Sequence, residues 1–542
     1  MTKKQPLIIV FPLIYLAERP EITIFVSKFI MMEQYNVKYL NTNTKVYLCC
    51  FAWALVLLFF ISPDSYTHDL HYRWDSAVFF SCGKAWMEGL LPYVDFADSK
   101  GPLLWLINGV AYLLSPYNYI GVFWLDVLSF SIVFYFDYKI ANIFLRDERL
   151  SLLAVPLVSL AYFNPWYHFE TSAEDWCQPV ISVAFYLLCR VFYAGGGTDS
   201  RHIRQAAFWL GFAMMWALLI KFSVTLMFGL TGCYFLYYLL KERLPVSITL
   251  LYFVFGLVSL ALPFVVYLVW TGTFESFVFE YFSNTMATVQ SENPLVVYVR
   301  EWLRTGYDAY YASLFVVCVA GSVMLGRRMK KDGWFFLVSF MGFYALSIHH
   351  AIHRHYVNCC LFFALFFVIA LLDRQREWLK KKALMLASVA LLLLITLNFT
   401  YTEGYLVPNL LVSGNTAEKA DYYKIGYYLS QVEKPTVIYY RFTDRGFGTL
   451  AGALPGSVYW HTQTGETEAM KKKQYEDALS ARADFVFCYK SEENDSLFTS
   501  VGYVKQCDTH EFSLYGKQQP KPFPASFRVS VLDVLLKRNP FR

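Results

Sequence analysis

The stretch WDSAVFFSCGKAWMEGLLPYVDFADSKGP, from Trp74 to Pro102, places six ionisable residues on a loop between long apolar segments. Apolar runs of this length on both sides indicate an integral membrane protein. Substrates are commonly bound by polar groups that rigid helices hold at a membrane surface. We therefore expect the functional site in this loop.

The composition supports a membrane protein. The chain has 542 residues, of which 56% are hydrophobic and 19% aromatic, and its mean hydropathy is +0.37. These values lie outside the usage of soluble globular proteins. The net charge of +5 is small for this length, and the basic residues form short clusters between apolar runs, which argues against nucleic-acid binding. The sequence predicts a polytopic α-helical membrane protein.

Eleven apolar runs are candidates for transmembrane helices. They lie at about 46–62, 119–137, 150–163, 176–194, 206–220, 222–240, 246–270, 308–325, 334–348, 357–372 and 383–400. Several are shorter than the roughly 20 residues of an ideal span, and the pair around Lys221 could be broken or re-entrant helices. The basic clusters share the cytoplasmic side if the apolar piece 102–114 does not cross the membrane.

This topology divides the chain into three parts. Residues 1–45 are a cytoplasmic segment, residues 46–400 a transmembrane domain with an outer loop at 63–118, and residues 401–542 an extracytoplasmic domain. The last part reads as a small α/β domain, with strands at 436–440, 485–488 and 503–506 and a polar helix at 466–482. Two questions stay open: whether Cys488 and Cys507 form a disulfide, and whether residues 1–31 precede a working start at Met32.

Acidic and basic side chains are expected to converge on the outer face. The first loop and the later outer turns supply Asp75, Asp95, Asp98, Lys100, Glu174, Asp175, Lys221, Arg354, His355 and Tyr356. This pairing suits transfer of a sugar from a polyprenyl phosphate to a hydroxyl group. An ionised Asp can take the proton of the acceptor, whereas the leaving phosphate needs cations and no proton donor.

The run GLLPYVDFADSKGPLLWLI at 89–107 resembles the first outer loop of GT-C glycosyltransferases of the protein O-mannosyltransferase and lipid A aminoarabinose transferase group (glycosyltransferase family 39-like). Asp75 matches the acidic residue that opens their surface helix, and Lys100 matches their basic residue before Pro-Pro. Ser76 stands where they often have a second acid, and Gly101 where they have Pro. The segments SAEDWCQP and HRHY resemble two further outer turns. The resemblance implies a GT-C fold over roughly 60–400.

The predicted function is inverting transfer of a sugar from a polyprenyl-phosphate donor to a hydroxyl acceptor, which is a glycolipid, a cell-surface glycan or a protein. The reaction would take place on the extracytoplasmic face of the plasma or inner membrane. The general base is Asp75. The predicted phosphate ligands are Lys100, Lys221, Arg354, His355 and Tyr356, and the predicted secondary or acceptor-binding acids are Asp95, Asp98, Glu174 and Asp175. The alternatives are a transporter or flippase of lipid-linked saccharides, and a glycan ligase or polymerase.

Each of these residues also has a plain structural interpretation. Asp75 could be only a helix N-cap, and Asp95 and Asp98 are expected to be turn formers that bond their own backbone. Lys100 could contact lipid headgroups, Lys221 could snorkel, and the acids at 174 and 175 suit a helix start. The run HHAIHRHY could bind a metal, but it contains no acidic base. No cofactor is therefore predicted, and dependence on a divalent metal stays open.

Overall fold

The computed structural model describes residues 41–66, 74–162, 171–194, 199–284, 294–329, 332–348, 354–376, 417–463 and 466–524, with isolated residues outside these ranges. The chain forms two units, Met1–Cys49 and Cys50–Arg542. The described part of the first unit is the beginning of one helix. The suggested start at Met32 lies outside the described residues.

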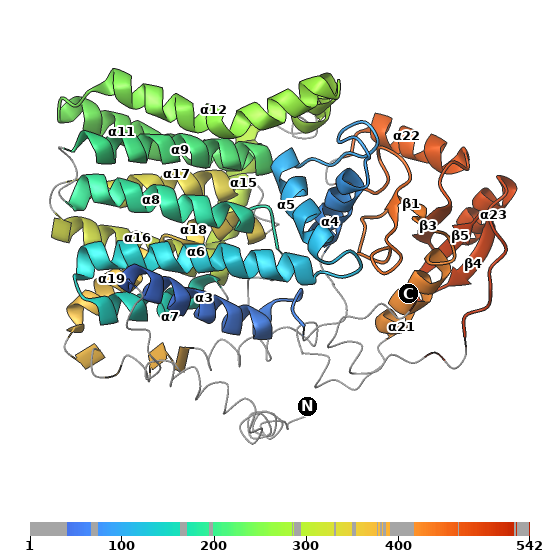
Figure 1. Cartoon of the computed structure of the whole chain (residues 1–542), viewed down its shortest axis with the longest axis horizontal. Coiled ribbons are helices and arrows are strands. Elements are labelled where there is room, and N and C mark those ends of the chain that lie inside the picture. The colour runs from blue at the N-terminus through green and yellow to red at the C-terminus, as the bar shows by residue number, and fades with distance from the viewer. Residues whose placement is uncertain are drawn as a thin grey trace. The chain divides into compact units, whose positions relative to one another are not determined.

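Helices, most of them apolar, build most of the second unit. They are α3 (Thr42–Ile61, which begins in the first unit), α6 (Ile120–Leu145), α7 (Glu148–Tyr162), α8 (Gln178–Tyr193), α9 (Ser200–Ile220), α10 (Phe222–Met227), α11 (Gly229–Lys241), α12 (Val246–Trp270), α15 (Pro294–Tyr307), α16 (Ala309–Met329), α17 (Phe335–Ser347) and α19 (Ala364–Arg374). Helices α6, α8, α9 and α12 run side by side, and each packs against the next (Figure 1). On α12, Phe255, Leu262 and Val266 are exposed, as expected for a face toward lipid.

Seven helical stretches in the described part are long and apolar enough to cross a membrane, so the chain is a multi-pass membrane protein. The predicted runs at 150–163, 334–348 and 357–372 form shorter helices, and most of 383–400 lies outside the described residues. The count of eleven spans therefore stays a prediction.

The basic clusters meet at one end of the helices. The Lys241 ammonium lies 3.3 Å from the Asp332 carboxylate, and the Tyr193 hydroxyl donates to the Asp332 carbonyl at 2.6 Å. Arg328 and Asp373 form an ion pair at 2.5 Å. The ends of α8, α11, α16 and α19 are thereby joined. The prediction that the cationic loops share one side agrees with this arrangement.

At the opposite end, the first loop folds into α4 (Trp74–Met87) and α5 (Pro102–Leu114), which cross at close range. A Cβ atom at Gly83 of α4 would lie 2.4 Å from the backbone nitrogen of Gly109, so only glycine allows this crossing. With 13 residues α5 is about 20 Å long, which is less than the hydrocarbon thickness. This length is consistent with the prediction that 102–114 does not span the membrane.

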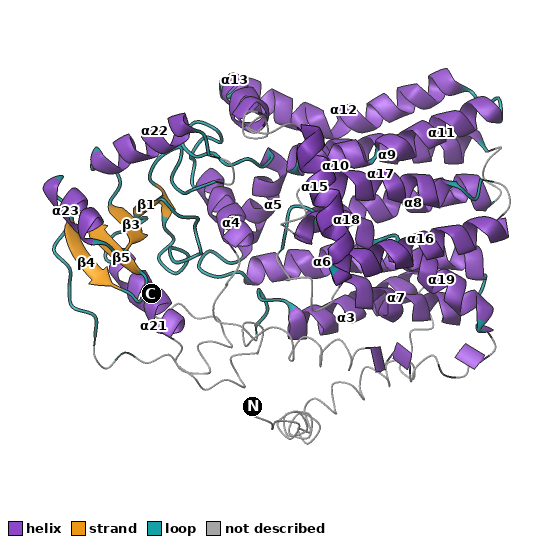
Figure 2. Cartoon of the chain, turned by 180° about the vertical axis from the view of Figure 1, so that it is seen from behind, coloured by secondary structure: helices purple, strands orange, loops and turns teal. Residues whose placement is uncertain are grey.

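The C-terminal domain holds a five-stranded mixed sheet in the order β2-β1-β3-β5-β4 (Figure 2). Its strands are β1 (Thr436–Tyr440), β2 (Leu454–Pro455), β3 (Phe485–Tyr489), β4 (Val504–Asp508) and β5 (Phe512–Gly516), and its helices are α21 (Ala417–Leu429), α22 (Glu468–Leu479) and α23 (Glu492–Ser500). The three predicted strands and the polar helix are confirmed. The short β2 and the strand β5 were not predicted.

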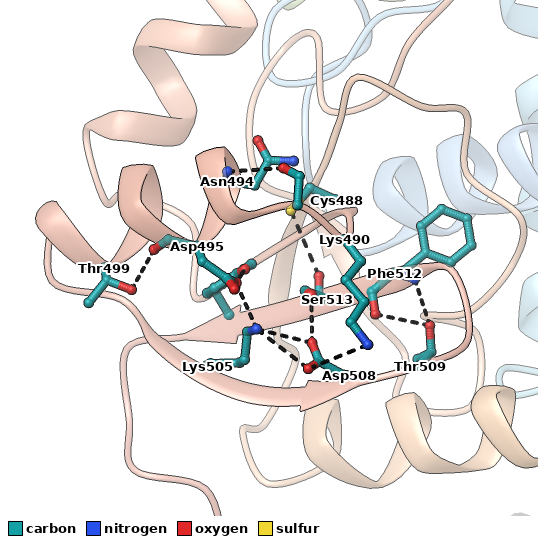
Figure 3. A network of polar contacts seen from close by, with 12 residues as sticks. Cys488, Lys490, Asn494, Asp495, Thr499, Lys505, Asp508, Thr509, Phe512 and Ser513 are labelled. Atoms are coloured by element: carbon teal, nitrogen blue, oxygen red, sulfur yellow. Dashed lines mark hydrogen bonds and ion pairs between the residues drawn. The ribbon is translucent and has the colours of Figure 1, made fainter.

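Cys488 and Cys507, whose pairing the sequence left open, do not form a disulfide. Cys488 pairs with Ser513 and Cys507 with Leu514 on opposite sides of β5, so two strand spacings, roughly 10 Å, separate them. A disulfide needs Cα atoms within about 7 Å. Figure 3 shows the polar contacts that occupy this region, where Lys505 bridges Asp495 of α23 at 2.7 Å and Asp508 of β4 at 3.2 Å.

Both thiols are therefore expected to be free and protected in the folded protein. Burial raises the pKa of each to about 12, which suppresses the reactive thiolate at neutral pH. Alkylation followed by mass spectrometry should modify both cysteines only after denaturation, without any reductant. A peptide pair linked through Cys488 and Cys507 in the unreduced protein would contradict this expectation.

Candidate functional site

A tight turn in the first loop is organised by Asp95. Its carboxylate accepts a hydrogen bond from the Leu91 amide at 2.7 Å, as predicted for a turn former. Tyr93 adopts a left-handed conformation (φ +66°), and its hydroxyl donates to the Lys100 carbonyl at 3.0 Å. Because this exposed carboxylate is engaged with backbone, Asp95 holds the shape of the loop that leads to Lys100.

The prediction that Asp98 bonds its own backbone is wrong. Asp98 is buried, and one of its carboxylate oxygens lies 3.8 Å from the Lys100 ammonium. The ammonium also donates to the Ser99 hydroxyl at 3.0 Å. The chain between Asp98 and Lys100 thus turns both charged groups into the protein.

The surroundings of Lys100 favour its charged form. Burial alone would lower its pKa, but the carboxylates of Asp98, Asp75 and Glu174, together with Tyr356, raise it above the ordinary lysine value. Asp75 lies in the first turn of α4 and is half-buried, as the sequence predicted for the acid that opens this helix. Two carboxylates of the first loop and that of Glu174, which is distant in sequence, therefore act on one ammonium group.

Gly101 joins the first loop to the interruption between α9 and α10. Its amide donates to the Ile220 carbonyl at 2.9 Å, which satisfies an acceptor that the end of α9 leaves open. A Cβ atom at this position would lie 2.2 Å from the Leu219 carbonyl oxygen. The close contact explains why glycine stands here, and it places Lys100 and Lys221 on adjoining segments.

Lys221 breaks the long apolar stretch, which confirms the predicted interruption. Its backbone is extended (φ −154°, ψ 107°) between α9 and α10. Its ammonium donates to the Glu174 carboxylate at 2.5 Å and lies 3.4 Å from the centre of the Tyr356 ring. Both side chains are largely buried, so Lys221 does not snorkel. It is held inside the protein by a carboxylate and an aromatic face.

Asp175 has a structural role. One of its carboxylate oxygens accepts from the Ser172 amide at 3.0 Å and hydroxyl at 2.9 Å, and the other accepts from the Asn358 side chain at 3.0 Å. These bonds tie the short 3-10 helix η2 (Asp175–Cys177) to α18 (Asn358–Leu361). Of the two neighbouring acids, Glu174 therefore contacts the cation and Asp175 builds the turn.

The last predicted group is only partly described. Arg354 and His355 lie in the short helix η6 (Arg354–Val357), but their side chains fall outside the described part, as do His349, His350 and His353. Within the described residues, no group of three or more His, Cys, Asp or Glu side chains could hold a metal ion.

Similarity to solved structures supports this architecture. The crystal structure of ArnT from Cupriavidus metallidurans bound to undecaprenyl phosphate matches with a TM-score of 0.62 at 11% identity, over 88% of this chain and 99% of that chain. The apo structure of the same protein matches with a TM-score of 0.59 at 12% identity, over 89% and 100%. No family model and no curated protein sequence matches. The fold is that of a GT-C glycosyltransferase.

Within this GT-C-like fold, the C-terminal domain packs against α4. The sequence did not predict this contact. The Ser81 hydroxyl of α4 donates to the Asp444 carboxylate at 2.8 Å. Lys84, one turn further along α4, is buried near Asp444, and burial lowers its pKa to about 8. Lys84 could have been singled out as a cation within an apolar helix, whereas no sequence signal connects Ser81 with a residue 363 positions later.

Two further contacts hold the C-terminal domain against the first loop. The Lys434 ammonium lies 2.6 Å from the Glu88 carboxylate, and this hydrogen bond lowers the pKa of Glu88. The Tyr119 and Thr449 hydroxyls lie 2.9 Å apart. The domain therefore contacts α4 and the start of α6, beside the charged groups described above.

The contact at Gly101 predicts a specific sensitivity. Gly101→Ala should destabilise the protein by about 1–3 kcal/mol, because the added methyl group meets a backbone carbonyl that cannot move aside. Gly306→Ala is the control, since a Cβ atom there meets no atom within 4 Å and alanine favours the helix α15. Thermal unfolding of both variants in lipid nanodiscs tests this, and equal melting temperatures would contradict it.

Proposed function

We propose that this protein is an inverting glycosyltransferase that moves a sugar from a polyprenyl-phosphate donor to a hydroxyl acceptor at the extracytoplasmic face of the membrane. The observation that carries the proposal is the pair of buried cations, Lys100 and Lys221, on segments joined by the Gly101–Ile220 hydrogen bond. A phosphodiester needs such fixed positive charge in a region of low dielectric.

The fold supports a lipid-linked donor. One solved structure with this fold is that of ArnT bound to undecaprenyl phosphate, and the present chain aligns with 99% of the ArnT chain. A lipid donor also accounts for a site built where apolar helices end. Tyr356, whose ring lies beside the Lys221 ammonium, is proposed to belong to the phosphate site. Arg354 and His355 on the same short helix are proposed to contact the phosphate as well.

The position of the basic clusters supports the proposed face. Cationic loops remain on the cytoplasmic side of a membrane, and these loops lie at the end of the helices opposite α4 and α5. The site and the C-terminal domain would then face outward. On this basis residues 1–45 are cytoplasmic, 46–400 form the transmembrane catalytic domain and 401–542 the extracytoplasmic domain.

In the proposed reaction, the acceptor oxygen attacks the anomeric carbon while the bond from that carbon to the phosphate oxygen breaks. Asp75 takes the proton of the acceptor hydroxyl, and the polyprenyl phosphate leaves with the electron pair of the broken bond. Lys100 and Lys221 offset the charge that develops on the phosphate. Asp95 bonds the backbone of its own turn, and Asp98 and Glu174 lie beside the two lysines.

Replacement of the proposed base should abolish transfer without loss of donor binding. Asp75→Asn should lower kcat by at least about 100-fold, because an amide cannot accept the proton. Asp95→Asn is the matched control, since an amide oxygen can still accept from the Leu91 amide. Transfer is measured with labelled sugars on undecaprenyl phosphate and protein in nanodiscs. Equal rates for both variants would exclude Asp75 as the base, and no transfer by the native protein from any donor would favour a transporter.

Loss of the first-loop cation should weaken donor binding. Lys100→Met should raise the Kd for undecaprenyl phosphate by about 10–100-fold, because a charge-assisted hydrogen bond is lost. Lys472→Met serves as the control, since Lys472 is exposed on α22 and pairs with Glu476 on the same helix. Fluorescence quenching or calorimetry in nanodiscs provides the Kd. An unchanged Kd for Lys100→Met would remove this residue from the phosphate site.

A further inference from the structure

Residues 458–463 of the C-terminal domain lie directly against the turn that carries Asp98. The Ala97 amide donates to the Val458 carbonyl at 2.9 Å, and the Gln463 side chain donates to the Ala97 carbonyl at 2.8 Å. Both backbone groups of the residue before Asp98 are thus bonded to this segment. His461 lies between the two points of attachment.

The same segment is fixed on its other side by the sheet. The Tyr439 amide of β1 donates to the Trp460 carbonyl at 2.7 Å, and the Thr462 amide donates to the Phe442 carbonyl at 2.9 Å. The Thr443 hydroxyl donates to the Thr462 carbonyl at 3.0 Å. Segment 458–463 is therefore rigid, and a side chain that it presents is held in place before any ligand arrives.

The hydrogen bond at Nδ1 defines the tautomer of His461. Nδ1 lies 3.0 Å from the Thr462 carbonyl oxygen, which can only accept, so Nδ1 carries the proton in the neutral ring. Nε2 then presents a lone pair. His461 is 2% exposed, and its Nε2 has no hydrogen-bond partner among the described residues.

The surroundings keep the ring neutral near pH 7. Burial lowers the pKa of His461, the carboxylates of Asp98 and Asp444 oppose this effect, and Lys100 adds to it. A neutral ring with Nδ1 protonated can accept one hydrogen bond through Nε2. The group that satisfies it must therefore be a donor, and a hydroxyl is the donor that the proposed substrates carry.

Other side chains of this region also have buried polar atoms for which the described residues offer no partner. They are Ser457 Oγ, Trp460 Nε1 and Thr462 Oγ1. A buried polar atom that has lost its hydration without gaining a hydrogen bond destabilises the fold, so such a concentration requires an explanation. Hydroxyl-rich ligands are suited to satisfy this mixture of donors and acceptors.

We propose that His461 is a substrate-binding residue whose Nε2 accepts a hydrogen bond from a carbohydrate hydroxyl bound beside Asp98 and Lys100. This inference rests on the proposed function and assigns the C-terminal domain a direct part in it. The hydroxyl belongs to the transferred sugar or to the acceptor. The two sources can be distinguished, because replacement of His461 weakens the binding of a different substrate in each case.

The test compares two replacements of the same ring. In His461→Asn, the amide can retain the contact at the Nδ1 position but offers nothing at Nε2, whereas in His461→Gln the longer side chain can place its carbonyl oxygen near Nε2. His510→Asn is the control, because His510 is exposed in the same domain. The readouts are the KM values of donor and acceptor, and the Kd values of undecaprenyl phosphate with and without its sugar.

His461→Asn should weaken the binding of one substrate by about tenfold, whereas His461→Gln should bind that substrate with nearly native affinity. If the hydroxyl is on the donor, the Kd rises only for the lipid that carries the sugar. If it is on the acceptor, only the acceptor KM rises. In the native protein this affinity should fall as the pH drops through the lowered pKa of His461, because protonation removes the lone pair, and the Gln variant should not show this loss.

Equal constants for native, Asn and Gln proteins, with transfer intact, would overturn the inference and leave the proposed function standing. A similar loss in both variants with a lower melting temperature would assign His461 a structural role, which also overturns it. Failure of the native protein to transfer any sugar would instead count against the proposed function.

Discussion

The contact between Lys221 and Glu174 is the constraint on which the site depends. An ammonium within apolar helices is stable only when its lost hydration is offset by a close carboxylate and further favourable contacts. The 2.5 Å hydrogen bond and the Tyr356 ring provide these, and the helix is interrupted at the same residue. The interruption exposes the Ile220 carbonyl, which the Gly101 amide then satisfies. The placement of Lys100 follows from this one arrangement.

The C-terminal domain supports the first loop from a second side. Its buried Asp444 accepts from Ser81 of α4, and its 458–463 segment bonds Ala97 on both sides. The first loop is therefore held between two rigid bodies, the helix ends and the sheet. Groups that must meet a substrate within a few tenths of an ångström need support of this kind. A loop with Asp75, Asp98 and Lys100 alone would not have it.

The sequence predicted features that local patterns encode. A short run of β-branched and aromatic residues predicted β1, hydropathy predicted the long helices, and the cation at 221 within an apolar run predicted the broken helix. The sequence did not predict contacts between distant segments. Asp98 looked like a turn former because Asp, Ser and Lys beside glycine are typical of turns, yet its partner is Lys100 inside the protein. The pairing of the two cysteines stayed open because neither the strand β5 nor its position between them was foreseen.

The charge balance of the site bears on how the proposed reaction could proceed. Lys100 and Lys221 each have a carboxylate neighbour, so neither cation is held without compensation when the donor is absent. A phosphodiester that approaches the two lysines must compete with Asp98 and Glu174 for their positive charge. Each carboxylate reduces the affinity of the site for a phosphate group. The reduction is larger for the doubly charged monoester that leaves than for the singly charged diester that binds. The same carboxylates that stabilise the empty site would therefore favour release of the product, which a site built of cations alone would retain.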